Sequence, residues 1–385
     1  GAAGHPIREK LNGRVSPKKG GHTMESASQS RQADKAKPLV SIKDIAKEAG
    51  VSICTVSLVM NNKDRNRVSK AVAQRVRGTA QSMGYKPNSV ARTLRTSRSY
   101  VLGFITDEIA TTPHAGRVLV GAQEAARKLG YILLTVNTGN DRELENQEIA
   151  ALRQYRVDGF LYAMMYHRVV EIPAELEGSP TVVVDSEDEN RKIPSIYPDD
   201  EMAGYDATNR LIQAGCKRIV YYGSSITIIA QGERFAGYRR ALADAGIPFD
   251  EQLVVNVEEA TNAASEAGRV FDEIKPDGIF CFNDVRATFI YEAARERSVG
   301  IGTDVSVISI DNQPLITDVL KPALTTLELP HYEMGFEAVR QLVAMIDDEV
   351  ATESLARSED SIRRLENGPM TPLRCRIIER DSIVS

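Results

Sequence analysis

Residues 52–58 combine hydroxyl groups with small apolar side chains, a composition suited to reading the edges of DNA bases. Hydroxyl groups form hydrogen bonds with base edges in the major groove, and apolar groups contact the methyl group of thymine. The spacing of Val56, Val59 and Met60 predicts a short helix that buries these three side chains. The other side chains then face outward near the start of the helix, which is the end that enters the groove in helix-turn-helix proteins.

Two capped helices joined by a glycine turn would position these side chains. Ser41 is placed to cap the first helix, with Asp44 completing a weak capping box, and Gly50 turns the chain. Ser52 is placed to cap the second helix. The residues of this segment that we predict to contact DNA are Ser41, Ser52, Ile53, Cys54, Thr55, Ser57, Leu58 and Asn61. An ordinary helical hairpin would show the same caps, so these helices alone leave that alternative open.

A third helical pattern follows a basic loop and strengthens the DNA-binding interpretation. It begins at Val68-Ser69, ends at Gly84, and turns Val72, Val76, Ala80 and Met83 inward. Charge points the same way, because residues 1–100 hold 20 Lys and Arg against 6 Asp and Glu, whereas the remaining residues hold 28 against 47. A positive headpiece attracts phosphates and an acidic body repels them.

From residue 100 onward, short apolar runs alternate with amphipathic helical patterns, which predicts parallel sheets covered by helices. The predicted strands are 101–105, 132–136, 159–162, 181–184, 218–222, 253–257, 278–282 and 305–310, with a final strand near 374–378. The predicted helices are 118–129, 145–155, 203–214, 234–245, 263–274 and 285–297. Two of the helices end in similar Gly-containing turns, which suggests two similar doubly wound subdomains.

Polar side chains follow several of these strands, and such side chains meet at the carboxyl ends of parallel strands. The residues concerned are Tyr162, Asp185, Asn283, Asp284 and Asp311. A ligand rich in hydroxyl groups requires partners of this kind, because each buried hydroxyl needs a hydrogen bond. For each residue alone, a helix cap or a turn is the alternative.

The runs DIAKEAGVS, TVS-x-V-x-N, GYKPN and VARTL, at residues 44–52, 55–61, 84–88 and 90–94, resemble the headpiece and hinge of the LacI/GalR family of bacterial transcription regulators. The resemblance continues to the final strand and leaves out residues 1–39 and about 351–372. It implies a body with the type I periplasmic-binding-protein fold, a small-molecule effector bound between its two subdomains, and a homodimer on a near-palindromic DNA operator.

The resemblance also assigns roles to single residues. It implies a short hinge helix capped by Asn88, in which Leu94 enters the minor groove beside Arg95; the predicted hinge contacts are Asn88, Ala91, Arg92, Leu94 and Arg95. Arg234 matches an effector-binding arginine of the family, and with Asn283 and Asp311 it forms the principal candidate set. Thr112 and His114 occupy the segment where the family usually has an Asn-Pro-Phe sequence.

Three departures from the family pattern bear on specificity. Leu58 stands where most members have an arginine that reads guanine, so we expect a different operator. Leu329 replaces a common glutamine, and the chain has no Trp to stack on a ligand. A purine would require an aromatic sandwich. These features favour a sugar as effector over a purine.

The remaining patterns bound the class of protein. The chain has no P-loop, no GxGxxG after a strand, no HExxH and no GxSxG, so we predict a protein that is not an enzyme and needs neither metal nor cofactor. Four cysteines without CxxC spacing indicate reduced thiols, and no signal peptide or membrane-spanning run is present, which predicts a cytoplasmic protein. A secreted sugar-binding protein without DNA function is the alternative.

The predicted organisation has four parts. Residues 1–39 form a disordered tail, in which Met24 is a candidate native start and the preceding residues an added extension. Residues 40–86 form the helix-turn-helix domain, 87–99 the hinge helix and linker, and 100–385 the effector-binding and dimerisation domain with its two subdomains.

Overall fold

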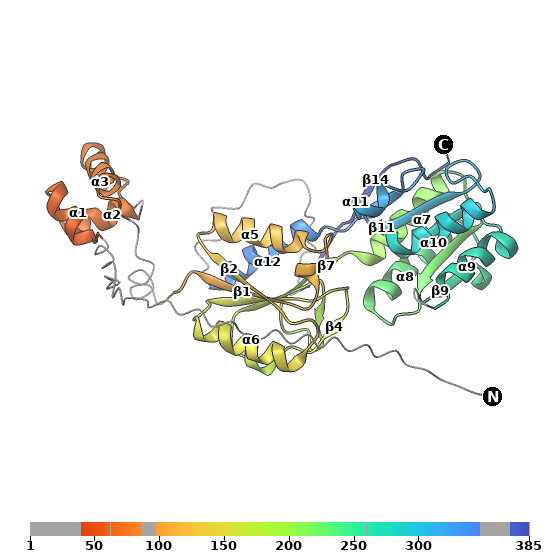
Figure 1. Cartoon of the computed structure of the whole chain (residues 1–385), viewed down its shortest axis with the longest axis horizontal. Coiled ribbons are helices and arrows are strands. Elements are labelled where there is room, and N and C mark those ends of the chain that lie inside the picture. The colour runs from red at the N-terminus through yellow and green to blue at the C-terminus, as the bar shows by residue number, and fades with distance from the viewer. Residues whose placement is uncertain (1–39, 62, 86–97, 259–260, 347–369, 385) are drawn as a thin grey trace, which may run out of the picture. The chain divides into compact units, whose positions relative to one another are not determined.

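The computed structural model describes residues 40–61, 63–85, 98–258, 261–346 and 370–384, and the chain divides into two units at Pro87 and Asn88 (Figure 1). The first unit is a small helical headpiece and the second is a larger α/β body. Within the described residues, no helix is both long enough and apolar enough to cross a membrane.

The headpiece contains the three predicted helices, α1 (Ile42–Ala49), α2 (Ile53–Met60) and α3 (Lys70–Ser82). The capping box of α1 is complete, because the Ser41 backbone amide donates to Asp44 and the Asp44 amide donates to the Ser41 hydroxyl. Gly50 adopts a left-handed φ of 64°, a conformation that glycine adopts without strain. Ile45, Val56 and Val76 are fully buried where the three helices meet.

The body contains two six-stranded sheets. The first has the order β13-β7-β5-β3-β1-β2 and the second the order β14-β12-β11-β10-β8-β9. The strands of the first sheet are β1 (Val101–Thr106), β2 (Ile132–Asn137), β3 (Gly159–Ala163), β5 (Thr181–Val184), β7 (Ser195–Pro198) and β13 (Met370–Leu373). Those of the second are β8 (Ile219–Ser224), β9 (Val254–Val257), β10 (Gly278–Cys281), β11 (Ser306–Asp311), β12 (Thr325–Glu328) and β14 (Arg376–Ile378). All strand pairs are parallel except β12 with β14, as the predicted doubly wound class requires.

Helices cover both faces of each sheet (Figure 1). The α-helices of the body are α5 (Arg117–Lys128), α6 (Arg142–Gln154), α7 (Asp200–Gln213), α8 (Ile229–Asp244), α9 (Ala263–Arg269), α10 (Asp284–Glu296), α11 (Pro314–Thr317) and α12 (His331–Ile346). Short elements are the 3-10 turns η1 (Ile109–Thr111), η2 (Ala174–Leu176) and η3 (Glu251–Leu253), the π-helical turn η4 (Val270–Ile274), and the paired strands β4 (Val169–Val170) and β6 (Glu187–Asp188). The single helix predicted over 263–274 is thus two elements.

The chain passes between the two sheets three times. It crosses from β7 to α7, from β12 to α12 and from β13 to β14, because α7 packs with α8 and β11 whereas α12 packs with α5, β3 and β5. The elements β7, β12, β13 and α12 were absent from the sequence prediction. β7 ends at Pro198, and α12 begins directly after Pro330. The short runs at these places show no clear periodicity.

Glycines let α7 and α8 touch along their backbones. A Cβ atom on Gly204 would overlap the carbonyl group of Arg234, and one on Gly237 would overlap the carbonyl oxygen of Glu201. By contrast, a Cβ atom on Gly232, also in α8, would meet no atom within 4 Å. The close approach brings Asp200, at the start of α7, against Arg234 of α8.

The two α8 glycines form a matched test of this contact. We expect Gly237→Ala to lower the free energy of unfolding by about 1–3 kcal/mol, because the helices must separate. We expect Gly232→Ala to raise it by about 0.5–1 kcal/mol, because alanine is the better helix former. Urea denaturation of both variants measures the difference, and equal effects would contradict the close packing.

Candidate functional site

The predicted reading surface lies on α2 and beside it. Ser52, Cys54 and Asn61 are exposed, as is Ile53, whose side chain is 50% exposed although apolar. Thr55, Ser57 and Leu58 are half-buried. The hydroxyl group of Ser52 accepts a hydrogen bond from the Thr55 amide at 3.0 Å, and that of Ser41 caps α1, so both serine side chains also serve as helix caps.

The predicted hinge contacts are not placed by the structure. Asn88, Ala91, Arg92, Leu94 and Arg95 lie outside the described residues. Their roles remain predictions.

A cleft between the two sheets of the body brings together five of the predicted effector-binding residues: His114, Asp185, Arg234, Asn283 and Asp311. Its inner part has a free volume of about 30 Å³, enough for only a few water molecules. An adjoining outer cavity of about 290 Å³ shares His114, Asp311, Leu329 and His331 with it. A sugar therefore fits only if the inner walls move apart or if it lies partly in the outer cavity.

Backbone strain is concentrated in the lining of the inner cleft. Tyr166, Asp185 and Asp311 have φ angles of 65°, 56° and 128°, a region that residues with side chains rarely adopt. Such conformations cost roughly 1–3 kcal/mol each and cluster at binding sites. Tyr166 and Asp185 follow β3 and β5, and Asp311 is the last residue of β11, so all three lie where the chain leaves a sheet.

A buried ionic network connects the two walls. His167 follows β3 in the first sheet, and its Nδ1 lies 2.9 Å from Oδ2 of Asp200 at the start of α7. Arg234 Nε donates to Asp200 Oδ1 at 2.7 Å, and its Nη1 donates to the Phe282 carbonyl oxygen at 2.7 Å. The other ring nitrogen of His167 lies 3.1 Å from Glu187 Oε1. Because an ionised carboxylate only accepts, both ring nitrogens of His167 donate and the ring is an imidazolium.

Electrostatics agree with that assignment. Burial alone would lower the pKa of His167, but the hydrogen bonds to Asp200 and Glu187 outweigh it and raise the pKa to about 10. Burial would raise the pKa of Asp200, but Arg234 and His167 outweigh it and lower the pKa. The backbone adds a further bridge between the walls, because the Ala230 amide donates to the His167 carbonyl oxygen at 3.1 Å. His167 therefore fastens the first sheet to α7 and α8.

Asp185 stands apart from this network. Only 5% exposed, its carboxyl group makes no hydrogen bond to any other residue that the structure describes. Burial raises its pKa to about 8, which favours the protonated form near neutral pH. On the opposite wall, burial also raises the pKa of Asp311, whose Oδ2 accepts from Gln313 at 2.8 Å.

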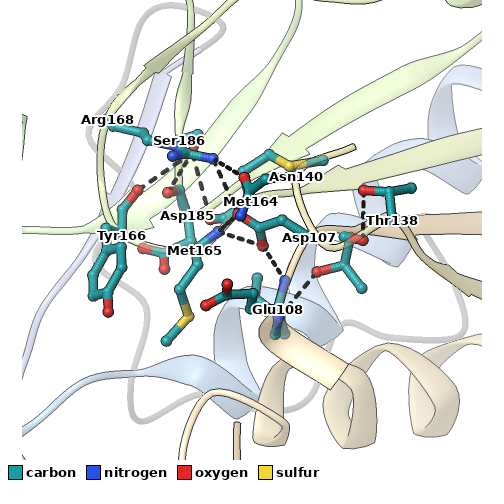
Figure 2. Close-up of polar contacts among 12 residues, drawn as sticks. Asp107, Glu108, Thr138, Asn140, Met164, Met165, Tyr166, Arg168, Asp185 and Ser186 are labelled. Atoms are coloured by element: carbon teal, nitrogen blue, oxygen red, sulfur yellow. Dashed lines mark hydrogen bonds and ion pairs between the residues drawn. The ribbon is translucent and has the colours of Figure 1, made fainter. Parts of the chain in front are cut away.

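Asp107 holds the loop that contains Met165, Tyr166 and Arg168, as Figure 2 shows. The same loop carries His167. Both carboxylate oxygens of Asp107 accept from the Met165 amide at 3.0 Å, and Arg168 donates to Asp107 at 3.0 Å. The Ser186 hydroxyl lies against the carbonyl oxygens of Met164 and Tyr166, at 3.5 and 3.4 Å, beside Asp185 (Figure 2). These contacts fix the first wall of the cleft.

Three predicted effector contacts lie outside the inner and outer cleft. Tyr162 packs with residues of α6, where its hydroxyl donates to Glu145 at 2.8 Å and borders a separate cavity of about 220 Å³. Asp284 is fully buried and accepts from Thr326 and from the Gln313 amide, so it holds the loop that carries Asp311. The Thr112 hydroxyl donates to the Glu108 carbonyl oxygen at 3.0 Å. A position at the end of a strand or just after it does not by itself determine the direction in which a side chain points.

Sequence reasoning missed His167, Asp200 and His331 as cleft residues. His331 is the first residue of α12, and the centre of its ring lies 5.6 Å from that of His114. Burial lowers the pKa of His331 to about 3. The acidic start of α7 and the proline before His331 were the available signals. Neither signal indicates a cleft by itself, because the chain brings these residues together only through its three crossings between the two sheets.

Within the described residues, one group has the spacing of metal ligands. Ligand atoms of His167, Asp200 and Glu233 all lie within 4.8 Å of one another. However, both nitrogens of His167 already bond carboxylates, and Arg234 places a cation on Asp200. The arrangement is that of an ionic network rather than an open metal site.

We expect the stabilising effect of His167 to depend on pH. Since its pKa is about 10 in the folded protein and 6.5 is its ordinary value, its stabilisation is complete below about pH 6.5 and is lost as the pH rises through 10. The difference in unfolding free energy between the wild type and His167→Gln should therefore shrink from pH 6.5 to 10. Urea denaturation at several pH values measures it.

His331→Gln is the matched control for that series. His331 stays neutral above pH 6.5 in both the folded and the unfolded chain, because its folded pKa is only about 3. Its effect on stability should be constant between pH 7.5 and 10. A constant difference for His167→Gln as well would show that His167 is not held as an imidazolium.

Comparisons with known proteins match each of the two units to a described family. Residues 41–88 match the family described as bacterial regulatory proteins of the lacI family. Residues 99–366 match the family described as periplasmic binding proteins and sugar binding domain of LacI family. This second match extends to residue 366, so it includes much of the segment near residues 351–372 that lacks the sequence resemblance described above.

Named relatives agree with the family matches. The chain is 32% identical to the HTH-type transcriptional regulator RegA of Clostridium saccharobutylicum, over 80% of this chain and 92% of that protein. It is 30% identical to the sucrose operon repressor of Escherichia coli, over 79% of this chain and 94% of that protein. Both are named as transcription regulators and neither as an enzyme.

Among solved structures, the lac repressor dimer bound to operator and the anti-inducer ONPF has a TM-score of 0.66 with this chain. That similarity covers 90% of this chain and all of that chain at 20% identity, which supports the fold. A helix-turn-helix headpiece, a two-sheet body with a polar cleft and the two family matches lead to one assignment. The chain belongs to the LacI family of bacterial transcription regulators.

Proposed function

We propose that this regulator is a repressor that binds a near-palindromic operator as a homodimer and loses or gains operator affinity when a sugar binds in the body cleft. The observation that carries the proposal is the convergence of His114, Asp185, Arg234, Asn283 and Asp311 on one cleft from both sheets. One headpiece reads one half-site, so two copies are required to read a palindrome. The chain acts where chromosomal DNA is, in the cytoplasm.

Ligand binding and DNA binding are coupled through the relative position of the two sheets. A ligand that contacts both walls favours the arrangement in which its partners are closest. By linkage, any ligand that changes operator affinity has its own affinity changed by operator to the same degree. The hinge from Asn88 to Arg95 is the proposed connection to the headpiece. A sugar-binding protein without DNA function is disfavoured by the lacI-family match over residues 41–88.

The test is to recover an operator by in vitro selection and to measure its affinity with and without a panel of sugars. We expect one palindromic motif, a protein dimer in sedimentation on that DNA, and a change in affinity with at least one sugar. Absence of any selected motif would overturn the DNA-binding proposal. A selected motif bound by a single protein copy would overturn the dimer.

We expect Leu58→Arg to change which operator is preferred. An arginine at this half-buried position of α2 can make a two-pronged hydrogen bond with guanine, worth about 1–3 kcal/mol, whereas leucine contacts only apolar groups. Affinity for sites with guanine at one position of each half-site should rise by about tenfold or more. Repeating the selection with the variant measures this, and an unchanged motif would show that residue 58 does not face the bases.

A further inference from the structure

The inner cleft has carboxyl groups in excess of cations. Its Arg234 and His167 side chains already contact Asp200, Glu187 and the Phe282 carbonyl oxygen. The other two imidazoles that line it, His114 and His331, pack against each other. No lysine lines the inner or the outer cavity within the described part of the chain. Arg117, in the outer cavity, is paired with Glu328 at 2.9 Å. An anionic ligand would therefore find no lysine in either cavity, and no arginine that is not already paired with a carboxylate.

Two acidic side chains on opposite walls have bonding capacity left. Asp185, 95% buried, makes no side-chain hydrogen bond to the described residues, and its backbone is held in a left-handed conformation. Asp311 uses one oxygen for Gln313. A third carboxyl group, that of Glu233, lies 3.8 Å from His167 Nδ1 without displacing Asp200. A buried carboxyl group without a partner is costly, so a ligand donor is expected there.

The charge balance decides which donor fits best. A ligand hydroxyl satisfies one lone pair of Asp185 but leaves the surplus of acidic groups unchanged. An ammonium group donates up to three hydrogen bonds and forms charge-assisted bonds with a carboxylate, which are about twice as strong as neutral ones. It also allows Asp185 to ionise inside the cleft. A phosphate or carboxylate in the same place would be a buried anion without a cationic partner of its own, which is costly in a medium of low dielectric constant.

We propose that the ligand of this cleft is a polyol that carries a protonated amine and no anionic group, an amino sugar, with its ammonium group against Asp185. The assignment rests on the proposed function in one respect, that the cleft is the effector site. The hydroxyl groups of the ligand then face Asn283, Arg234 and Asp311 on the second wall. The amine distinguishes this ligand from a neutral sugar, and the absence of phosphate distinguishes it from a sugar phosphate.

The test uses the full-length protein and matched ligands. Isothermal titration calorimetry compares glucosamine with glucose, N-acetylglucosamine and glucose 6-phosphate, and repeats the comparison for the galactose and mannose series. N-acetylation keeps the substituent and removes its charge. In at least one series we expect the amino sugar to bind about tenfold or more tightly than the other three. Operator affinity is measured on the same samples.

Two isosteric variants locate the effect. Asp185→Asn keeps the shape of the side chain and should abolish the preference for the amine. Asp381→Asn, an exposed residue of the second sheet region, should retain it. Asp185→Glu keeps the charge and should retain part of the preference, which separates loss of charge from misfolding.

Four results would overturn the proposal: equal binding of amino sugar and parent sugar, tighter binding of a sugar phosphate, a preference that survives Asp185→Asn, or no binding of any amino sugar by protein that binds operator. Loss of operator binding with the amine preference intact would instead count against the proposed function. The two proposals can therefore fail separately.

Discussion

Replacing Arg234 with methionine is expected to lower the free energy of unfolding of the body by about 3–5 kcal/mol, the usual loss when one partner of a buried ion pair is removed. Asp200 is fully buried and would keep only His167 as a cationic partner. The Phe282 carbonyl oxygen would also lose its donor. Urea denaturation followed by tyrosine fluorescence measures the change, since every tyrosine except Tyr85 lies in the body.

Arg240→Met is the matched control, because Arg240 lies on the same helix and also pairs with a carboxylate of α7, Glu201. Its side chain is 41% exposed, so water screens that pair and its loss should cost only about 0–1 kcal/mol. Similar losses for the two variants would mean that burial of Asp200 does not make Arg234 essential.

Operator affinity is expected to fall by roughly 10³- to 10⁵-fold when salt is raised from 50 to 200 mM, if about 6–10 phosphates are contacted. The cause is release of counterions when the basic headpiece replaces them, and residues 1–100 hold 20 of the 48 Lys and Arg of the chain. Fluorescence anisotropy with the selected operator gives the slope of log affinity against log salt. A shallow slope would show that binding does not depend on phosphate contacts.

Variants of two exposed lysines distinguish the contribution of the headpiece to the salt dependence from that of the body. Lys63 lies in the loop after α2, and Lys217 lies in the body before β8. If Lys63 contacts a phosphate, Lys63→Gln should reduce the salt slope by about one. Lys217→Gln should leave the slope unchanged, because we expect the acidic body to repel DNA. An equal reduction by both variants would place DNA on the body as well.

Local signals predicted the elements, and in part the cleft. Ser41, Ser52 and Gly50 mark helix ends by short-range hydrogen bonding and backbone conformation, which depend only on neighbouring residues. The alternation of short apolar runs with helical patterns likewise predicted most strands of both sheets. Their strands predicted Asp185 and Asp311 at the carboxyl ends of the sheets, and the family resemblance implied that one cleft lies between the two subdomains.

Side-chain direction and long-range connections were beyond the reach of the sequence. Tyr162 packs with α6 and not in the cleft, and its hydroxyl donates to Glu145 of that helix. His167 and Asp200 meet only because the chain crosses from β7 to α7, and β7 was not predicted. The network that fastens the two walls therefore depends on contacts that no local pattern encodes.

The late position of α12 in the chain has a consequence for how the body is made. This helix packs on β3, β5 and α5, and β13 adds the edge strand beside β7, yet both follow the whole of β8 to β12 in the sequence. During translation, the first sheet emerges long before the helix that covers its apolar face. Nascent chains with such uncovered surface are prone to aggregation. The first half of the body therefore matures only after the ribosome has finished the second.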